Sequence, residues 1–321
     1  MQLRELGTTG IMVSPVALGC WPIAGMTSPD VTDEQSLQTL HAAVECGINV
    51  LDTAYAYGLD GESERLIAEA LGTQREQLVI ASKGGISLRG DGTRDLDGRP
   101  ATLRAHCEKS LERLQTDYLD LLYLHAPDPR VPVTESAGAL RELMKEGKTR
   151  SIGVSNFTLQ QLIDFQGECP IAAFQPPYNM LQREIELDTL PWCRENSVSV
   201  MVYWPLMKGL LAGKLARDHV FAAGDSRLKY PMFQGEEWEK NQDLVDALRE
   251  LGSRSGHSVA QLAVSWTLSQ PGISVALCGA KRPEQIRETA GAMDRSLDST
   301  TLAAIDQLLL ERGTPITRAA V

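Results

Sequence analysis

The chain has 321 residues, 43% of them hydrophobic, and a formal net charge of −11 at pH 7. This length can bury one large core or be divided into two domains. An acidic surface repels phosphate backbones, which argues against nucleic acid as a partner. The six cysteines are scattered and form no C-x-x-C pair. This spacing favours reduced, mostly buried thiols in a cytoplasmic protein over a metal site or a disulfide framework.

Neither the first residues nor the longest apolar stretch of the sequence predicts an association with membranes. The first residues are charged and lack the apolar run of a signal peptide. The longest apolar stretch, residues 198–207, is too short to cross a bilayer.

Short apolar runs alternate with amphipathic segments along the chain, which is typical of buried parallel strands separated by helices. The predicted strands are residues 13–18, 50–52, 79–83, 119–123, 152–154, 173–175, 198–203 and 274–277. The predicted helices are residues 33–46, 64–71, 102–114, 134–146, 159–165, 185–196, 259–268 and 284–290. Thr32 and Gln35 form a capping box before the first helix. Eight such units favour a closed (β/α)8 TIM barrel over a doubly wound sheet.

Three further segments complete the predicted architecture. Residues 3–10 are expected to form a small β-hairpin against the floor of the barrel. Residues 87–100 and 208–238 are rich in glycine and charge and predict long loops after the third and seventh strands. In a barrel both loops lie on the C-terminal face, where active sites are built. No linker divides the chain, so we expect a single domain over residues 1–321.

Polar side chains follow three consecutive predicted strands. Asp52 ends the second strand and Tyr57 follows it, Lys83 ends the third, and His125 comes just after the fourth. A phenol has a pKa of roughly 10 in water, and a nearby ammonium lowers that pKa. Lys83, fixed by Asp52, could therefore tune a tyrosine as a general acid or base, while His125 orients a carbonyl oxygen. On geometry alone Tyr55 competes with Tyr57.

Each of these residues taken singly has an ordinary structural explanation. An Asp or His at a strand end often caps a loop, a lysine there often forms a salt bridge, and a tyrosine before glycine often packs. The combination of all four on neighbouring strands is what indicates a catalytic site.

From about residue 6 to residue 291 the sequence resembles the aldo-keto reductases. The similarity lies in Asp52-Thr-Ala-Tyr-Ala-Tyr-Gly58, Gly61-Glu-Ser-Glu64, Asp120-Leu-Leu-Tyr-Leu-His125, Gly147-Lys-Thr-Arg-Ser-Ile-Gly-Val-Ser-Asn-Phe157 and Gln175-Pro-Pro-Tyr-Asn179. The resemblance implies a (β/α)8 barrel, and a catalytic tetrad of Asp52, Tyr57, Lys83 and His125, which selects Tyr57 over Tyr55.

The resemblance also implies a nicotinamide cofactor and residues that hold it. Ser155, Asn156 and Gln175 match the polar residues around the carboxamide, and Tyr203 matches the aromatic side chain on the nicotinamide ring. The remaining implied contacts lie in the pyrophosphate loop and around the adenosine 2′-phosphate: Pro205, Leu206, Gly209, Leu211, Lys214, Arg227, Gly279, Lys281, Arg282 and Gln285.

The sequence departs from the family pattern at three places. Thr289 replaces an asparagine that contacts adenine, Gly279-Ala280 replaces a Lys-Ser pair, and Trp204 replaces the serine of Tyr-Ser-Pro. The adjacent cations Lys281 and Arg282 still favour NADP(H), with NAD(H) as the alternative.

These observations predict an NADP(H)-dependent oxidoreductase that reduces aldehydes or ketones, or oxidises the corresponding alcohols or sugars, with a tyrosine as general acid and base. Trp21, Tyr57 and His125 are expected to line the substrate site, and no metal is expected. One alternative is a cofactor-sensing regulatory subunit on the same barrel, similar to the potassium-channel β-subunits. Another is a Schiff-base lyase with Lys83 as the nucleophile. The physiological substrate, the preferred direction and the oligomeric state stay open.

Overall fold

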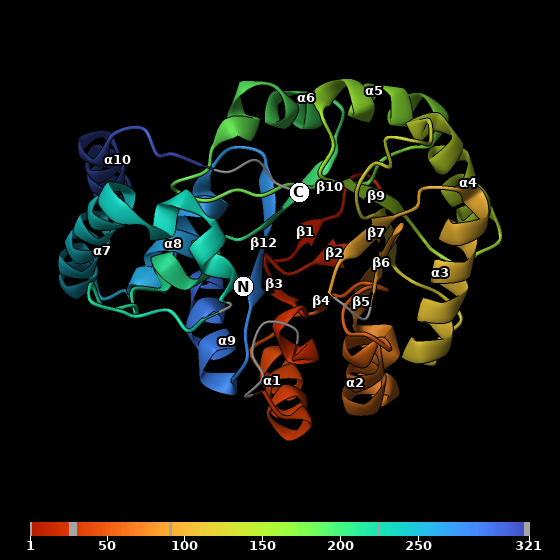
Figure 1. Cartoon of the computed structure of the whole chain (residues 1–321), viewed down its shortest axis with the longest axis horizontal. Coiled ribbons are helices and arrows are strands. Elements are labelled where there is room, and N and C mark those ends of the chain that lie inside the picture. Colours follow the sequence, from red (N-terminus) through yellow and green to blue (C-terminus); the bar gives the residue numbers. More distant parts are fainter. Residues whose placement is uncertain (1, 26–30, 90–91, 224, 318–321) are drawn as a thin grey trace.

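The computed structural model describes residues 2–25, 31–89, 92–223 and 225–317. Eight parallel strands in this part of the chain form a closed barrel, visible at the centre of Figure 1. Each strand pairs with the next, and the last closes onto the first. In order around the barrel they are β3 (Val16–Gly19), β4 (Val50–Asp52), β5 (Val79–Gly84), β8 (Leu121–Leu124), β9 (Ile152–Ser155), β10 (Ala173–Gln175), β11 (Ser199–Tyr203) and β12 (Ile273–Gly279).

A ring of helices surrounds the barrel, as Figure 1 shows. The predicted capping box before the first helix is confirmed, because the Thr32 side chain accepts a hydrogen bond from the backbone of Gln35. The closed eight-stranded barrel with its surrounding helices confirms the predicted (β/α)8 TIM barrel. The single domain over residues 1–321 stays a prediction. The ring consists of α1 (Asp33–Glu45), α2 (Glu62–Leu71), α3 (Pro100–Leu114), α4 (Val133–Lys145), α5 (Leu159–Glu168), α6 (Thr189–Glu195), α8 (Val259–Ser269) and α9 (Pro283–Ala290).

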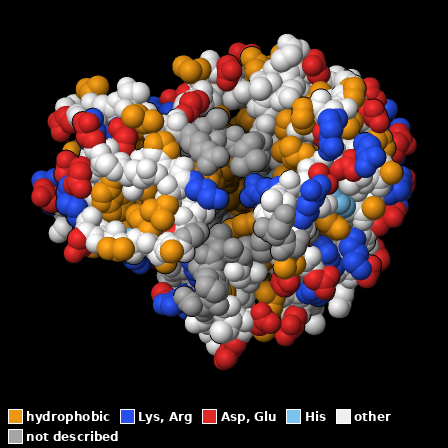
Figure 2. Space-filling view, viewed as in Figure 1, with side chains coloured by type: hydrophobic (Ala, Val, Ile, Leu, Met, Phe, Trp, Pro, Cys, Tyr) orange, Lys and Arg blue, Asp and Glu red, His pale blue; other side chains and the backbone are white. Residues whose placement is uncertain are grey.

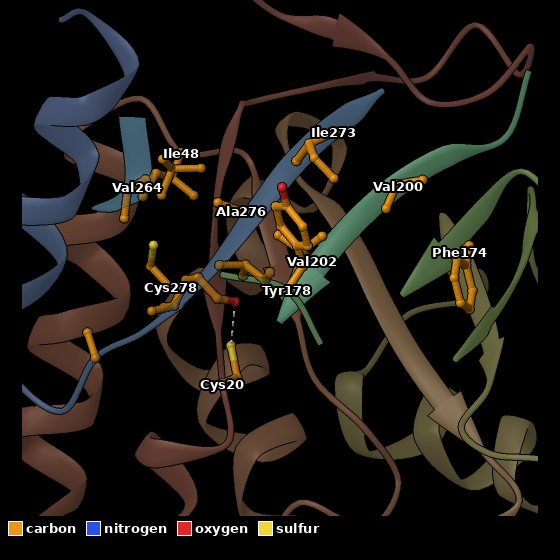
Figure 3. Close-up of a cluster of buried hydrophobic side chains, with 14 of the residues drawn as sticks. Cys20, Ile48, Phe174, Tyr178, Val200, Val202, Val264, Ile273, Ala276 and Cys278 are labelled. Atoms are coloured by element: carbon orange, nitrogen blue, oxygen red, sulfur yellow. Dashed lines mark hydrogen bonds between the residues drawn. The ribbon is translucent and has the colours of Figure 1, made fainter. Parts of the chain in front are cut away.

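The hydrophobic core has two main layers, set by the alternation of side chains along the strands. One layer fills the inside of the barrel with residues such as Val50, Ala81 and Met201. The other lies between the barrel and the helices, and Figure 3 shows part of it around Val202 and Cys278. Because both faces of each strand are buried, the strands read as continuous apolar runs.

The amino-terminal hairpin lies at the floor of the barrel, as predicted. It consists of β1 (Arg4–Glu5) and β2 (Met12–Val13), and the Arg4 guanidinium donates to the carbonyls of Ile273 and Ser274 at the start of β12. The predicted bounds were wrong, since residues 12 and 13 belong to the hairpin, whereas the first barrel strand starts at Val16. Pro15 separates the two strands because it has no N–H to donate.

Regular structure occurs where the sequence predicted only loops. Residues 87–100 contain most of a second hairpin, β6 (Ile86–Leu88) with β7 (Arg94–Leu96), although residues 90–91 lie outside the described part. The predicted loop 208–238, of which residue 224 lies outside the described part, is interrupted by 3-10 turns and ends inside α7 (Gly235–Ser255), a helix that the sequence did not predict.

Helix α7 packs on α10 (Ser299–Arg312), which also was not predicted. Arg312 joins them through the buried side chains of Glu237 and Asn241. In the described ranges no helix has the length and apolar character needed to cross a membrane.

Candidate active site

The four predicted catalytic residues converge at the C-terminal end of the barrel. Asp52 is the last residue of β4. Lys83 is the penultimate residue of β5 and pairs in register with Tyr123 of β8. His125 directly follows β8, and Tyr57 lies in the loop after β4. Neighbouring parallel strands end at the same rim, which is why residues far apart in sequence meet here.

Lys83 is the centre of the cluster. Its ammonium donates to Asp52 Oδ1 at 2.5 Å, to the carbonyl of Thr53 at 2.8 Å and to the Tyr57 hydroxyl at 3.3 Å. The Lys83 side chain is fully buried. Burial opposes the charged form, but the charges of Asp52 and Tyr57 outweigh it and raise the pKa of Lys83. Lys83 is therefore a fixed cation beside the phenol.

The pKa values of Tyr57 and His125 are shifted in opposite directions. Burial raises the pKa of Tyr57, and the neighbouring Lys83 opposes that rise. Burial, with Lys83 next, lowers the pKa of His125 well below its ordinary value, so this imidazole is neutral at pH 7. The two rings meet edge to face with centroids 6.0 Å apart, and Trp21 meets Tyr57 in the same way at 5.1 Å.

The competing tyrosine has a different environment. The Tyr55 ring stacks on His106 at 3.7 Å, and the Arg113 guanidinium covers it at 4.7 Å from the ring centroid. The Tyr55 ring is thus engaged in packing against His106 and Arg113. The geometry therefore favours Tyr57 as the tyrosine that works with Lys83.

A row of polar residues continues from the tetrad across the barrel rim. Gln175 donates to Asp52 Oδ2 at 2.7 Å, and the Ser155 hydroxyl donates to the Gln175 carbonyl at 2.7 Å. The Asn156 amide donates to the carbonyl of His125 at 3.0 Å and accepts from the Tyr203 hydroxyl at 2.8 Å. The four residues predicted around the nicotinamide thus form one network with the tetrad.

The loop after β11 has an unusual backbone. Residues Trp204, Met207 and Lys208 adopt positive φ angles, a conformation that non-glycine residues rarely take and that is concentrated at functional sites. Gly209 also has a positive φ, and a Cβ added there would meet nothing within 4 Å. The backbone of this loop is therefore open to a ligand at Gly209.

The predicted pyrophosphate contacts in this loop differ in their exposure. Pro205 begins the loop, and Leu206 is partly buried against the core. Lys214 is exposed and forms an ion pair with Glu288 of α9, which ties the loop to that helix. The Leu211 side chain is fully buried, and its backbone N–H donates to the Leu206 carbonyl, so it supports the loop from below.

The residues predicted for the adenosine end gather around the start of α9. Gly279 ends β12, and Lys281 donates its N–H to the Gln285 side chain at 2.8 Å. Arg282 is exposed at the position that caps α9. Arg227 pairs with Asp225 at 2.6 Å. The pKa of Asp225 is lowered first by Arg227 and also by Lys281, so the two segments lie close enough to interact.

Two of the departures from the family pattern have clear structural settings. Trp204 meets the rings of Tyr203 and Tyr230 edge to face at 5.1 and 5.7 Å, with the Lys208 ammonium 4.6 Å from its centroid. It is thus built into the loop after β11. Thr289 is buried, and its hydroxyl donates back to the carbonyl of Gln285 in its own helix. Its side chain therefore faces away from any ligand at the start of α9.

Two contributors to the site could not be read from the sequence. Thr53 acts through its backbone carbonyl, which any residue could supply. Arg94, in the hairpin after β5, places its guanidinium 5.6 Å from the centroid of Trp21. The only available signal was the charge of residues 87–100, which does not show which arginine faces inward. Across the ranges that the structure covers, no group of three or more His, Cys, Asp or Glu side chains could hold a metal ion.

Comparisons with known proteins identify the family of the chain. The model of the aldo/keto reductase family matches residues 15–310. An aldo-keto reductase of Bacillus subtilis (strain 168), YhdN, is 36% identical over 96% of this chain and 94% of its own. The NADH-specific methylglyoxal reductase of Escherichia coli (strain K12) is 34% identical over 96% of this chain and 99% of its own.

A solved structure gives the same result in three dimensions. The glycerol dehydrogenase AKR11B4 of Gluconobacter oxydans superposes with a TM-score of 0.90 at 36% identity, covering 99% of this chain and 98% of that one. The family match spans nearly the whole barrel, and the relatives are similar over nearly their full lengths. The chain therefore belongs to the aldo/keto reductase family of oxidoreductases.

Proposed function

We propose that this protein is an NADP(H)-dependent reductase of small aldehydes or ketones, which also oxidises the corresponding alcohols, with Tyr57 as the general acid and base. The observation that carries the proposal is the line of contacts from Asp52 through Lys83 to the Tyr57 hydroxyl. A phenol held beside a buried ammonium can release a proton and be left as a stabilised phenolate.

The residues present fit a nicotinamide cofactor. The amides of Asn156 and Gln175 and the hydroxyl of Ser155 offer both donors and acceptors, as a carboxamide requires. The partly exposed Tyr203 ring provides a flat surface beside them, tied to Asn156 by its hydroxyl. The open backbone at Gly209 permits close approach of a bulky group to the loop. When bound, the cofactor supplies the hydride donor or acceptor.

The roles of the chain's own residues follow from their charges. In reduction the Tyr57 hydroxyl would give its proton to the carbonyl oxygen while the bound cofactor would supply hydride to the carbonyl carbon. Lys83 stabilises the phenolate that remains, and Asp52 keeps Lys83 charged and oriented. Neutral His125 can donate a hydrogen bond to the same oxygen without competing for its proton. Alcohol oxidation uses the same groups in reverse.

The charge of Lys83 argues against the Schiff-base alternative. A lysine nucleophile must be neutral, and enzymes obtain this by lowering its pKa. Here Asp52 and Tyr57 raise the pKa of Lys83 in spite of its burial. The three donors of the ammonium also point at three oxygen atoms. The nitrogen therefore has no free lone pair with which to attack a carbonyl.

The preference for NADP(H) rests on charge at the start of α9. Lys281 and Arg282 are adjacent cations, and Arg227 lies on the loop near them. A 2′-phosphate is a dianion that suits such a cluster. The Escherichia coli relative is described as NADH-specific, so the choice between the cofactors has to be measured on this chain.

Kinetics with a neutral aromatic aldehyde and either NADPH or NADH tests the proposal. We expect sustained turnover with NADPH, and a loss of about a thousandfold or more in Tyr57→Phe with cofactor affinity retained, because the proton donor is gone. Tyr55→Phe is the matched control and should keep most of the activity. Turnover of Tyr57→Phe at the level of Tyr55→Phe would refute the role of Tyr57. A single slow turnover in the wild type would favour a cofactor-sensing regulatory subunit instead.

A further inference from the structure

The hairpin β6–β7 covers the residues next to the catalytic ones. Ile86 of β6 packs with Ala56 and Ala126, and Leu96 of β7 packs on the same cluster. Ala56 directly precedes Tyr57, and Ala126 directly follows His125. The hairpin therefore packs on the immediate sequence neighbours of Tyr57 and His125.

The pairing register of this hairpin decides which side chains face the site. Ile86 pairs with Leu96, and Leu88 pairs with Arg94. Side chains two residues apart on a strand lie on the same face, so Arg94 shares the face of Leu96. Asp95 lies on the opposite face and forms an ion pair with Arg89.

The Arg94 side chain reaches the aromatic wall of the active site. Its guanidinium carbon lies 5.6 Å from the Trp21 ring centroid, and Trp21 in turn meets Tyr57 at 5.1 Å. The positive charge of Arg94 also opposes the rise that burial causes in the pKa of Tyr57, and it adds to the lowering of the pKa of His125 by burial and Lys83. Arg94 thus lies at the mouth of the site, and its charge is felt at the reacting groups.

The charge of Arg94 has no carboxylate partner within the described ranges of the chain, whereas three acidic residues of the neighbouring segments pair with other arginines. Asp95 pairs with Arg89, Asp97 with Arg99, and Asp128 with Arg130. Figure 2 shows Lys and Arg side chains on both sides of the hollow at the centre of the face that it presents. A protein with a net charge of −11 thus presents a cation at the entrance to its active site.

We propose that Arg94 is a specificity-determining residue that binds the carboxylate of an anionic carbonyl substrate while the carbonyl lies against Tyr57 and His125. This inference rests on the proposed reductase function and names its substrate class. A guanidinium and a carboxylate form paired, charge-assisted hydrogen bonds. Trp21 would pack on the chain between the carboxylate and the carbonyl.

The test compares two aldehydes that differ only in charge, para-formylbenzoate and its neutral amide, para-formylbenzamide. We expect the wild type to favour the carboxylate by about tenfold or more in kcat/KM. Arg94→Gln should lose this preference through a higher KM for the carboxylate, whereas any change in kcat that follows from removing its charge near Tyr57 and His125 should be equal for both aldehydes. Arg94→Lys should keep part of the preference, because it retains the charge but not the paired donors.

Arg89→Gln is the matched control, since it removes one positive charge from the same hairpin on the face away from Trp21. It should leave the preference for the carboxylate unchanged. The proposal is overturned if the wild type shows no preference, or if Arg89→Gln and Arg94→Gln reduce it equally.

Turnover of the neutral amide separates this proposal from the reductase proposal. If the wild type reduces neither aldehyde, the reductase function fails, and calorimetric titration of both aldehydes in the presence of oxidised cofactor decides the role of Arg94. Tighter binding of the carboxylate that is lost in Arg94→Gln supports that role, and equal binding of both aldehydes refutes it.

Discussion

Replacing Lys83 with methionine isolates the contribution of one charge to the proposed chemistry. Methionine has a similar length but cannot hold a phenolate. At an effective dielectric constant of about 20, a unit cation 3.3 Å from a phenolate oxygen stabilises it by about 5 kcal/mol. The transition state of proton transfer carries roughly half of that charge, so about 2.5 kcal/mol is lost, or nearly a hundredfold in rate.

The substitution also affects Asp52, whose carboxylate would lose its ammonium partner and keep the hydrogen bond from Gln175. A buried charge without its partner destabilises the fold. The double variant Asp52→Asn/Lys83→Met removes both charges, and a thermal melt of each variant shows whether the folded state is retained.

The assay is alcohol oxidation followed by cofactor absorbance across the pH range, because in that direction Tyr57 has to be deprotonated to act as the base. We expect Lys83→Met and the double variant to lose about a hundredfold in kcat and to require a higher pH for their remaining activity. Lys148→Met is the control, since Lys148 precedes β9 and so lies at the opposite end of the barrel, where it pairs with Glu146. A Lys83→Met enzyme with the wild-type rate and pH profile would refute the reasoning.

Three further predictions concern stability. Burial lowers the pKa of His106 to about 4, so the stability due to its neutral ring is complete above pH 6.5 and is lost as the pH falls through 4. In urea unfolding, the wild type should lose about 3 kcal/mol more than His106→Gln between pH 7 and pH 4. Equal losses in the two proteins would contradict this. Arg312→Met leaves buried Glu237 without its cation and should lower the free energy of unfolding by about 3 kcal/mol, whereas an unchanged urea midpoint would count against it. Gly61→Ala should lower the melting temperature, because Gly61 has a positive φ and its Cβ would lie 2.4 Å from the Arg113 guanidinium; a melt equal to the wild type would exclude that clash.

The barrel and the cluster at its rim could be predicted because they depend on local patterns. Buried parallel strands read as apolar runs, and their ends fixed where Asp52, Lys83 and His125 would meet. The choice of Tyr57 over Tyr55 came from the family resemblance. The structure supports that choice through the contact with Lys83, which no local pattern shows.

The elements that the sequence missed depend on tertiary contacts. Helix α7 buries Glu237 and Asn241 against Arg312 of α10, so polar residues occupy positions where a helix usually shows apolar ones. The β6–β7 hairpin has strands of three residues each, too short for an alternation to be recognised. The orientation of Arg94 depends on its register, which only the folded hairpin defines.

A crystal structure of the protein with bound NADP⁺ tests the central claim most directly. We expect the nicotinamide ring against Tyr203, its carboxamide on Ser155, Asn156 and Gln175, and its reactive carbon facing the space beside the Tyr57 hydroxyl. A dinucleotide bound elsewhere, or a Tyr57 hydroxyl turned away from both Lys83 and the nicotinamide, would contradict it.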